Sequence, residues 1–145
     1  MKTAPAGPDE ARIIVIDSSV AVKWFKTDDE AAVDAASALL EEHRSQRVTL
    51  AVPGHFAAEV LNALRYSHLE LDYVHAAAGA LEDIDLVTAP LTRRLTEPAV
   101  ALARTHDLSI NNALFPALAV LLDAELVTAD HVQARVTECP VRLLV

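Results

Sequence analysis

Short apolar runs alternate with longer amphipathic stretches along the chain, and this alternation predicts strands and helices in turn. The first run, at 13–16, consists of Ile and Val only, which is typical of a strand buried on both faces. Further strands are predicted at 48–52, 86–88 and 126–129, with an edge strand at 141–145. Helices are predicted at 18–25, 29–44, 55–67, 72–83, 92–106 and 111–123, with a short helix after residue 130.

Polar residues just ahead of the apolar stripes predict where several helices begin. Ser18 or Ser19 is expected to cap the first helix, because a side-chain oxygen there can accept from a free backbone amide. Asp72 and Thr92 are expected to cap the fourth and fifth helices. The sixth is expected to begin at residue 111 or 112.

Because strands and helices alternate throughout, we predict an α/β fold with a parallel sheet and right-handed crossovers. The length of 145 residues fits one domain. Residues 1–11 contain Pro5, Gly7 and Pro8 but no apolar stripe, so we predict a flexible N-terminal tail, followed by one domain over 12–145.

The formal net charge of −9 has the wrong sign for passive attraction to nucleic acid. Metal ions at a carboxylate cluster would invert that sign locally, and a basic partner protein could also use it. No apolar run reaches the roughly 20 residues of a membrane span, and no signal peptide is visible, so we expect a cytoplasmic protein. The single cysteine, Cys139, excludes an intramolecular disulfide and is expected to be a small, half-buried side chain.

Two acidic residues directly follow predicted strands, where ligands bind in open parallel sheets. These are Asp17, after the first strand, and Asp130, after the run 126–129. Each could simply cap the next helix, but together they indicate a shared site. A third candidate, Glu59, lies on one helical stripe with Phe56 and Ala63, where a carboxylate needs a cation or a hydrogen-bond donor unless it reaches water.

These residues carry a resemblance to a known family. The segment Val-Ile-Asp-Ser-Ser-Val-Ala-Val-Lys-Trp-Phe at 15–25 resembles the opening motif of PIN domains, especially VapC-type toxins. The segment Glu-Val-Leu-Asn-Ala-Leu at 59–64 is similar to the helix that bears the family's acidic Glu. Leu-Val-Thr-Ala-Asp at 126–130 is similar to the segment that ends in its last acidic residue. The resemblance covers the chain from about residue 12 onward.

The resemblance implies a three-layer α/β/α fold and an acidic quartet that binds Mg²⁺ or Mn²⁺. It implies an endoribonuclease that is the toxin of a type II toxin–antitoxin pair, forms a homodimer and is silenced by a cognate antitoxin. Asp17, Glu59 and Asp130 would hold the metal, and the metal would activate water for attack on the RNA phosphate. Ser19 and Thr128 could orient the carboxylates by hydrogen bonds, or serve only in capping and strand packing.

The fourth acidic position of the family pattern is occupied by Asn112. An amide offers one neutral carbonyl oxygen, so we expect Asn112 to be a weaker metal ligand than Asp. The lost attraction is roughly 4 kcal/mol for unit charges at 4 Å and an effective dielectric of 20, before solvation offsets it. Either Asn112 is natural and the nuclease is weak or inactive, or it replaces an Asp so that a toxic protein can be produced. Pro116 is expected in the first helical turn, which needs no amide donor.

Three alternatives to an active nuclease are considered. A phosphoacceptor receiver domain needs a Lys after a late strand, and no Lys occurs beyond Lys26. A haloacid-dehalogenase-type phosphatase needs a second Asp two residues after the first, where the chain has Ser19. The third is a catalytically inactive PIN-fold module that binds RNA or an antitoxin without cleavage, and Asn112 favours it.

Overall fold

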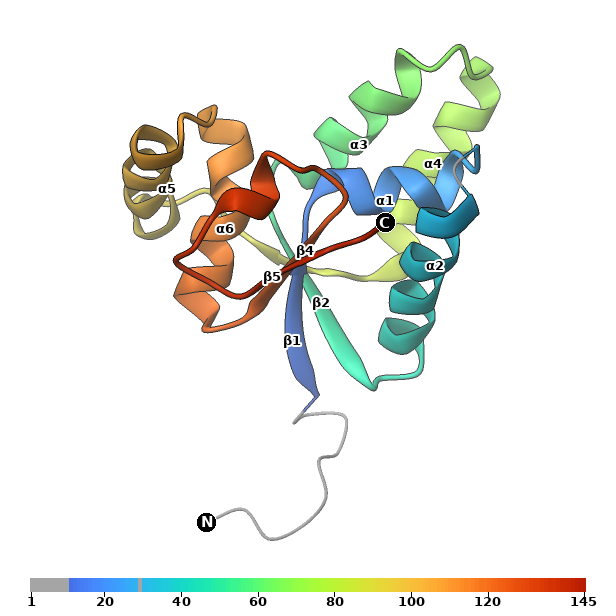
Figure 1. Cartoon of the computed structure of the whole chain (residues 1–145). Helices are drawn as coiled ribbons and strands as arrows, with labels where there is room; N and C mark the ends of the chain where they lie inside the picture. Colours follow the sequence, from blue (N-terminus) through green and yellow to red (C-terminus); the bar gives the residue numbers. More distant parts are fainter. Residues whose placement is uncertain (1–10, 29) are drawn as a thin grey trace, which may run out of the picture.

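The computed structural model describes residues 11–28 and 30–145, and its core is one parallel sheet of five strands in the order β3-β2-β1-β4-β5 (Figure 1). The predicted tail therefore lies outside the described residues, apart from Ala11, as does Asp29, the predicted start of the second helix. The strands are β1 (Arg12–Ile16), β2 (Val48–Pro53), β3 (Val87–Ala89), β4 (Glu125–Thr128) and β5 (Val141–Leu143). The helices are α1 (Ser18–Phe25), α2 (Glu30–Arg44), α3 (Phe56–Arg65), α4 (Leu71–Ile84), α5 (Arg93–His106), α6 (Ile110–Leu122) and the short 3₁₀ helix η2 (Gln133–Arg135).

The central strand β1 is apolar on both faces because helices cover the sheet on both sides. Its last three residues, Ile14, Val15 and Ile16, are fully buried. The strand pairs in parallel with β2 on one side and β4 on the other, and Ile16 lies opposite Val127. The predicted parallel sheet is confirmed. This register brings the carboxyl ends of β1 and β4 to the same level, so the residues that follow them are neighbours.

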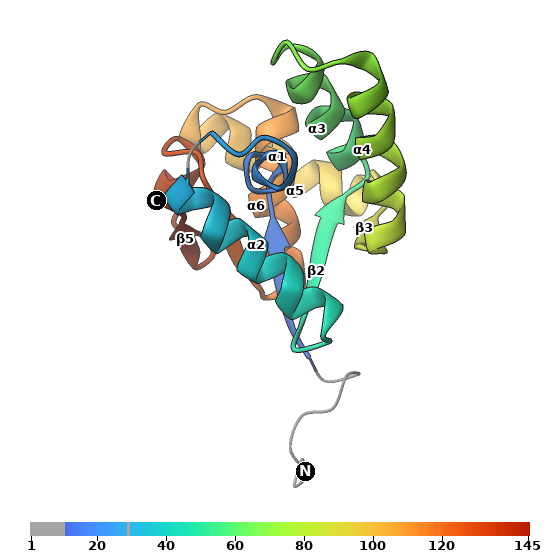
Figure 2. The ribbon, with the colours of Figure 1, turned by 90° about the vertical axis from the view of Figure 1, so that its right-hand side faces the viewer.

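Helices form a layer on each face of the sheet, which confirms the expected three-layer architecture. Helix α6 packs against β1, β2 and β4, and α5 packs on α6. On the opposite face α1 contacts β4 and α2 contacts β2, while α3 and α4 form a pair beside α1 (Figures 1 and 2). Phe115, on α6, is fully buried and anchors that helix in the core.

Two of the predicted caps differ from those in the structure, and α6 begins earlier than predicted. Asp17, rather than Ser18 or Ser19, caps α1, because its carboxylate accepts from the Ser19 amide. The cap position of α4 is residue 70, so Asp72 lies in the first turn instead. Helix α6 begins at residue 110, and its cap is a serine at 109. Thr92 occupies the cap position of α5 as predicted, but its side chain makes no capping hydrogen bond.

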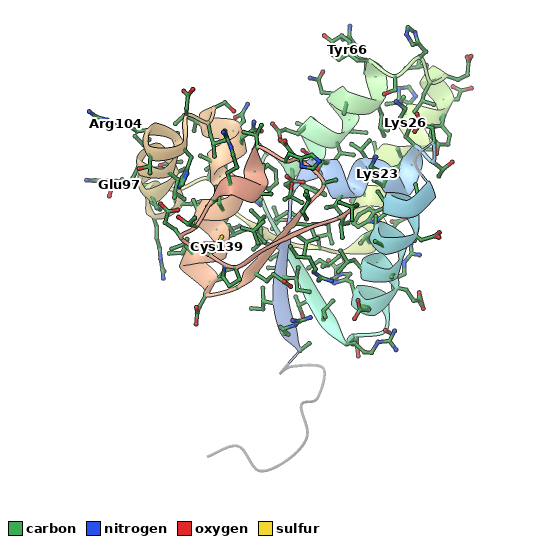
Figure 3. All side chains as sticks on the ribbon, in the orientation of Figure 1. Lys23, Lys26, Tyr66, Glu97, Arg104 and Cys139 are labelled. Carbon is green, nitrogen blue, oxygen red and sulfur yellow. The ribbon has the colours of Figure 1, made fainter. Side chains whose placement is uncertain are left out.

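Three further features concern membrane-spanning helices, an exposed aromatic side chain and the cysteine. A helix long and apolar enough to cross a membrane is not found in the described part of the chain. Tyr66 lies just beyond α3, 70% exposed, and points away from the rest of the molecule (Figure 3). Cys139 is buried beside the last strand, and burial raises the pKa of its thiol to about 11, so it stays protonated at neutral pH.

Candidate functional site

The carboxylate of Asp17 lies buried at the carboxyl end of β1, only 3% exposed. Its Oδ1 accepts from the backbone amide of Ser19 at 3.0 Å and from the Ser19 hydroxyl, and its Oδ2 accepts from the hydroxyl of Thr128 at 2.5 Å. Burial raises the pKa of Asp17 to about 6, although these hydrogen bonds favour the charged form and act in the opposite direction. The protein therefore places a carboxyl group with raised proton affinity at the end of its central strand.

Asp130 follows β4 and is tied to the same cluster. Its backbone amide donates to the hydroxyl of Thr128 at 2.9 Å, so one threonine side chain connects Asp130 to Asp17. The Ala129 amide donates to the Ser19 hydroxyl at 2.9 Å, which joins the two strand-end loops a second time. The charge of Asp130 contributes to the raised pKa of Asp17. The structure thus brings two of the four predicted site residues together.

Both strand-end carboxylates also accept from backbone amides of the segments that follow them, but only Asp17 has the capping role that was the alternative for both. Asp17 caps α1, and the Oδ1 of Asp130 accepts from the Val132 amide at 2.9 Å. The two roles are compatible, because an ionised carboxylate has about four lone-pair positions and these bonds leave some free. These hydrogen bonds also fix the direction in which each carboxylate points.

Glu59 approaches this cluster from α3 through the residue next to Asp17. Its Oε1 accepts from the Ser18 hydroxyl at 3.1 Å and lies 3.8 Å from Nε2 of His55. Ser18 and His55 were not assigned to the site on sequence grounds. The four-residue spacing of His55 and Glu59 on one helix face was an available signal, whereas the bond between Ser18 and Glu59 joins positions 41 residues apart.

Asn112 lies half-buried in the first turn of α6. Its backbone amide donates to Oγ of Ser109, and its backbone carbonyl accepts from Nε2 of Gln133 at 2.8 Å. The expectation that Pro116 lies in the first helical turn is wrong, because α6 begins at residue 110 and Pro116 is well inside it. Gln133, which no sequence pattern indicated, supplies the hydrogen bond that this proline cannot make.

The donor chemistry of the strand ends fits a hard divalent cation in part. Asp17 and Asp130 offer carboxylate oxygens, which Mg²⁺ and Mn²⁺ prefer, and a cation would stabilise the charge of Asp17, whose pKa is raised mainly by burial and to a lesser extent by Asp130. Glu59, the third carboxylate, is engaged with Ser18 and His55. Within residues 11–28 and 30–145, no three His, Cys, Asp or Glu side chains lie close enough together to hold a metal ion. The acidic pair is thus the part of the predicted ligand set that the fold assembles.

Sequence comparison assigns the chain to a family. The family model for the PIN domain matches residues 14–138, which include all four predicted site positions. The chain belongs to the PIN domain family. Among curated proteins, none matches this PIN chain.

Solved structures share the fold of this PIN chain at low sequence identity. VapBC2 from Rickettsia felis, bound to a DNA fragment from its promoter, matches with a TM-score of 0.66 and 15% identity over 90% of this chain and 98% of that one. VapC20 from Mycobacterium tuberculosis, a sarcin-ricin loop cleaving toxin, matches with a TM-score of 0.65 and 18% identity over 88% of this chain and 98% of that one. A toxin–antitoxin complex from Klebsiella pneumoniae matches with a TM-score of 0.62 and 19% identity over 88% of this chain and 98% of that one.

Proposed function

We propose that this PIN-domain protein is a divalent-metal-dependent endoribonuclease, the toxin component of a toxin–antitoxin pair. The observation that carries the proposal is the Asp17–Asp130 pair, in which the Thr128 hydroxyl joins the Asp17 carboxylate to the backbone amide of Asp130 and burial keeps the proton affinity of Asp17 high. A buried carboxylate beside a second acidic residue destabilises the fold when it is ionised, unless a cation binds there, which is typical of a functional site rather than a stabilising one. Membership of the PIN family and the VapC-like fold support the same function.

In this proposal Asp17 and Asp130 hold Mg²⁺ or Mn²⁺, with Glu59 and Asn112 as the further oxygen donors. The bound cation supplies Lewis-acid chemistry at the RNA phosphate and a more acidic water. Ser19 and Thr128 keep the Asp17 carboxylate oriented by donating to both of its oxygens. The Ser18 hydroxyl holds Glu59 beside the residue that follows Asp17, and in this proposal Glu59 turns from there toward a cation bound by Asp17.

RNA cleavage by this chain is expected to require added Mg²⁺ or Mn²⁺ and to stop in EDTA. Asp130→Asn removes one charge of the acidic pair, so we expect the rate to fall on the order of 100-fold. Asp83→Asn, at an exposed position of α4, is the matched control and should cleave like the unaltered chain. The measurement is gel-resolved cleavage of a panel of structured RNAs that includes a sarcin-ricin loop hairpin. Cleavage that is unaffected by EDTA or by Asp130→Asn would contradict the metal mechanism.

A second function is favoured by Asn112 and by the engagement of Glu59 with Ser18 and His55. In that case the chain is a PIN-fold module that binds RNA or an antitoxin and does not cut. It would retain RNA in a binding assay while no divalent metal produced cleavage.

The proposed partners are a cognate antitoxin and a second copy of this chain in the cytoplasm. A net charge of −9 suits a basic antitoxin segment, and the neighbour from Klebsiella pneumoniae is itself a toxin–antitoxin complex. Size-exclusion chromatography with light scattering is expected to give about 31 kDa, twice the chain mass of 15.6 kDa. A mass of one chain at high protein concentration would exclude the homodimer.

A further inference from the structure

Gln133 is a polar side chain enclosed in the core next to the candidate site. It opens η2, three residues after Asp130, and is only 1% exposed. Its Nε2 donates to the carbonyl of Asn112 at 2.8 Å, whereas its Oε1 is buried without a partner among the described residues. Only the NH₂ end of the amide can donate to a carbonyl, so the hydrogen bond sets which end faces α6. Burying a side-chain amide costs free energy unless the amide is hydrogen-bonded, so the one hydrogen bond that Gln133 makes offsets part of that cost.

The backbone carbonyl of Asn112 needs a donor from outside its own helix because of Pro116. In an α-helix the carbonyl of one residue accepts from the amide four residues later. Four residues after Asn112 is Pro116, which is buried in α6 and has no N–H group. Gln133 therefore donates where the helix cannot.

The neighbouring backbone carbonyl of the same turn, that of Asn111, also has a donor from outside α6. Nε2 of His55 lies 2.9 Å from the carbonyl oxygen of Asn111 and acts as its donor. His55 precedes α3 and lies beside Glu59, whereas Gln133 follows Asp130. The first turn of α6 is thus connected to the segment that carries Glu59 and to the loop that carries Asp130.

We propose that Gln133 is a positioning residue of the candidate site, which replaces the amide missing at Pro116 and holds Asn112 in place relative to Asp130. The proposal rests on the proposed function insofar as Asn112 and Asp130 belong to one metal site. The loop after β4 and the first turn of α6 then move as one unit.

The test separates the hydrogen bond from the packing of Gln133. Gln133→Leu keeps most of the volume and removes the donor. The Ala113 amide, which donates to the Ser109 carbonyl, belongs to the same peptide group as the Asn112 carbonyl. It should therefore exchange with solvent about five-fold faster, which corresponds to the loss of about one net hydrogen bond. Mn²⁺ affinity, read from the EPR signal of the free ion, should fall about 10- to 100-fold, as for other groups that orient metal ligands.

Pro116→Ala restores a backbone amide opposite the Asn112 carbonyl, so it should rescue Gln133→Leu in both measurements. Pro98→Ala is the matched control, because Pro98 also lies inside a helix but in α5, and it should not rescue. If Gln133→Leu alone does not fold, the double variants decide, since folding is expected with Pro116→Ala and not with Pro98→Ala.

Unchanged Ala113 exchange in Gln133→Leu, or equal rescue by the two proline replacements, would overturn the positioning role. The binding measurement is repeated with Asn112→Asp. If neither that variant nor the unaltered chain binds Mn²⁺, the proposed metal site fails, whereas the exchange and rescue results still decide the role of Gln133.

Discussion

Asp17→Asn is expected to stabilise the metal-free protein at pH 8 by up to about 3 kcal/mol. The pKa of Asp17 is about 6 in the folded chain against 3.8 for the ordinary group, a difference of about two units at 1.36 kcal/mol each. Between pH 3.8 and 6 the folded chain therefore keeps a proton that the unfolded chain has lost, so the free energy of unfolding falls as the pH rises through this window. An amide never acquires the buried charge.

The measurement is urea unfolding of both proteins in EDTA at pH 3.5, 5 and 8. We expect the difference between them to be small at pH 3.5, to grow through the window and to be constant above it. Asp34→Asn, at an exposed position of α2, is the control and should change stability by less than about 0.5 kcal/mol. A difference that does not depend on pH would mean that Asp17 is not buried as a charged group. The same Asp17→Asn protein should lose Mn²⁺ binding. The charge of Asp17 would then lower the stability of the metal-free protein and be needed to bind the metal.

Asn112→Asp is expected to raise RNA cleavage at subsaturating Mg²⁺ by roughly 10- to 1000-fold in kcat/KM. The upper value corresponds to roughly 4 kcal/mol of added attraction between a carboxylate and a nearby cation, and solvation reduces it. Without metal, the added charge should instead destabilise the fold through repulsion by Asp17 and Asp130. Metal addition should therefore stabilise Asn112→Asp more than the unaltered chain.

Asn111→Asp is the matched control for this change. Asn111 is exposed and lies in the same first turn, so its replacement adds the same net charge at the same helix N-terminus. Equal cleavage by the two variants would show that Asn112 does not face the metal. Cleavage that appears only in Asn112→Asp would instead identify the unaltered chain as the non-cutting module.

Local sequence signals were sufficient for the elements and for two of the site residues. An Ile and Val run marks β1, and apolar runs that end in Asp mark the ends of β1 and β4, where a parallel sheet binds its ligands. Cap identities were less predictable, because the side chains of Ser18, Ser19 and Asp17 all have oxygens that can accept a hydrogen bond from a backbone amide. Only the geometry at the end of β1 shows that Asp17 is the cap and leaves Ser18 to donate to Glu59.

The sequence by itself determined a parallel α/β chain with acidic residues after its central strands, because periodicity and residue type act over a few neighbouring positions. Only the tertiary structure decided which of those residues meet. Thr128 joins Asp17 across 111 positions, and Gln133 reaches the carbonyl that Pro116 leaves without a donor. Such contacts depend on strand register and on how α6 packs against the sheet, and both are set by the burial of the whole core rather than by any local pattern.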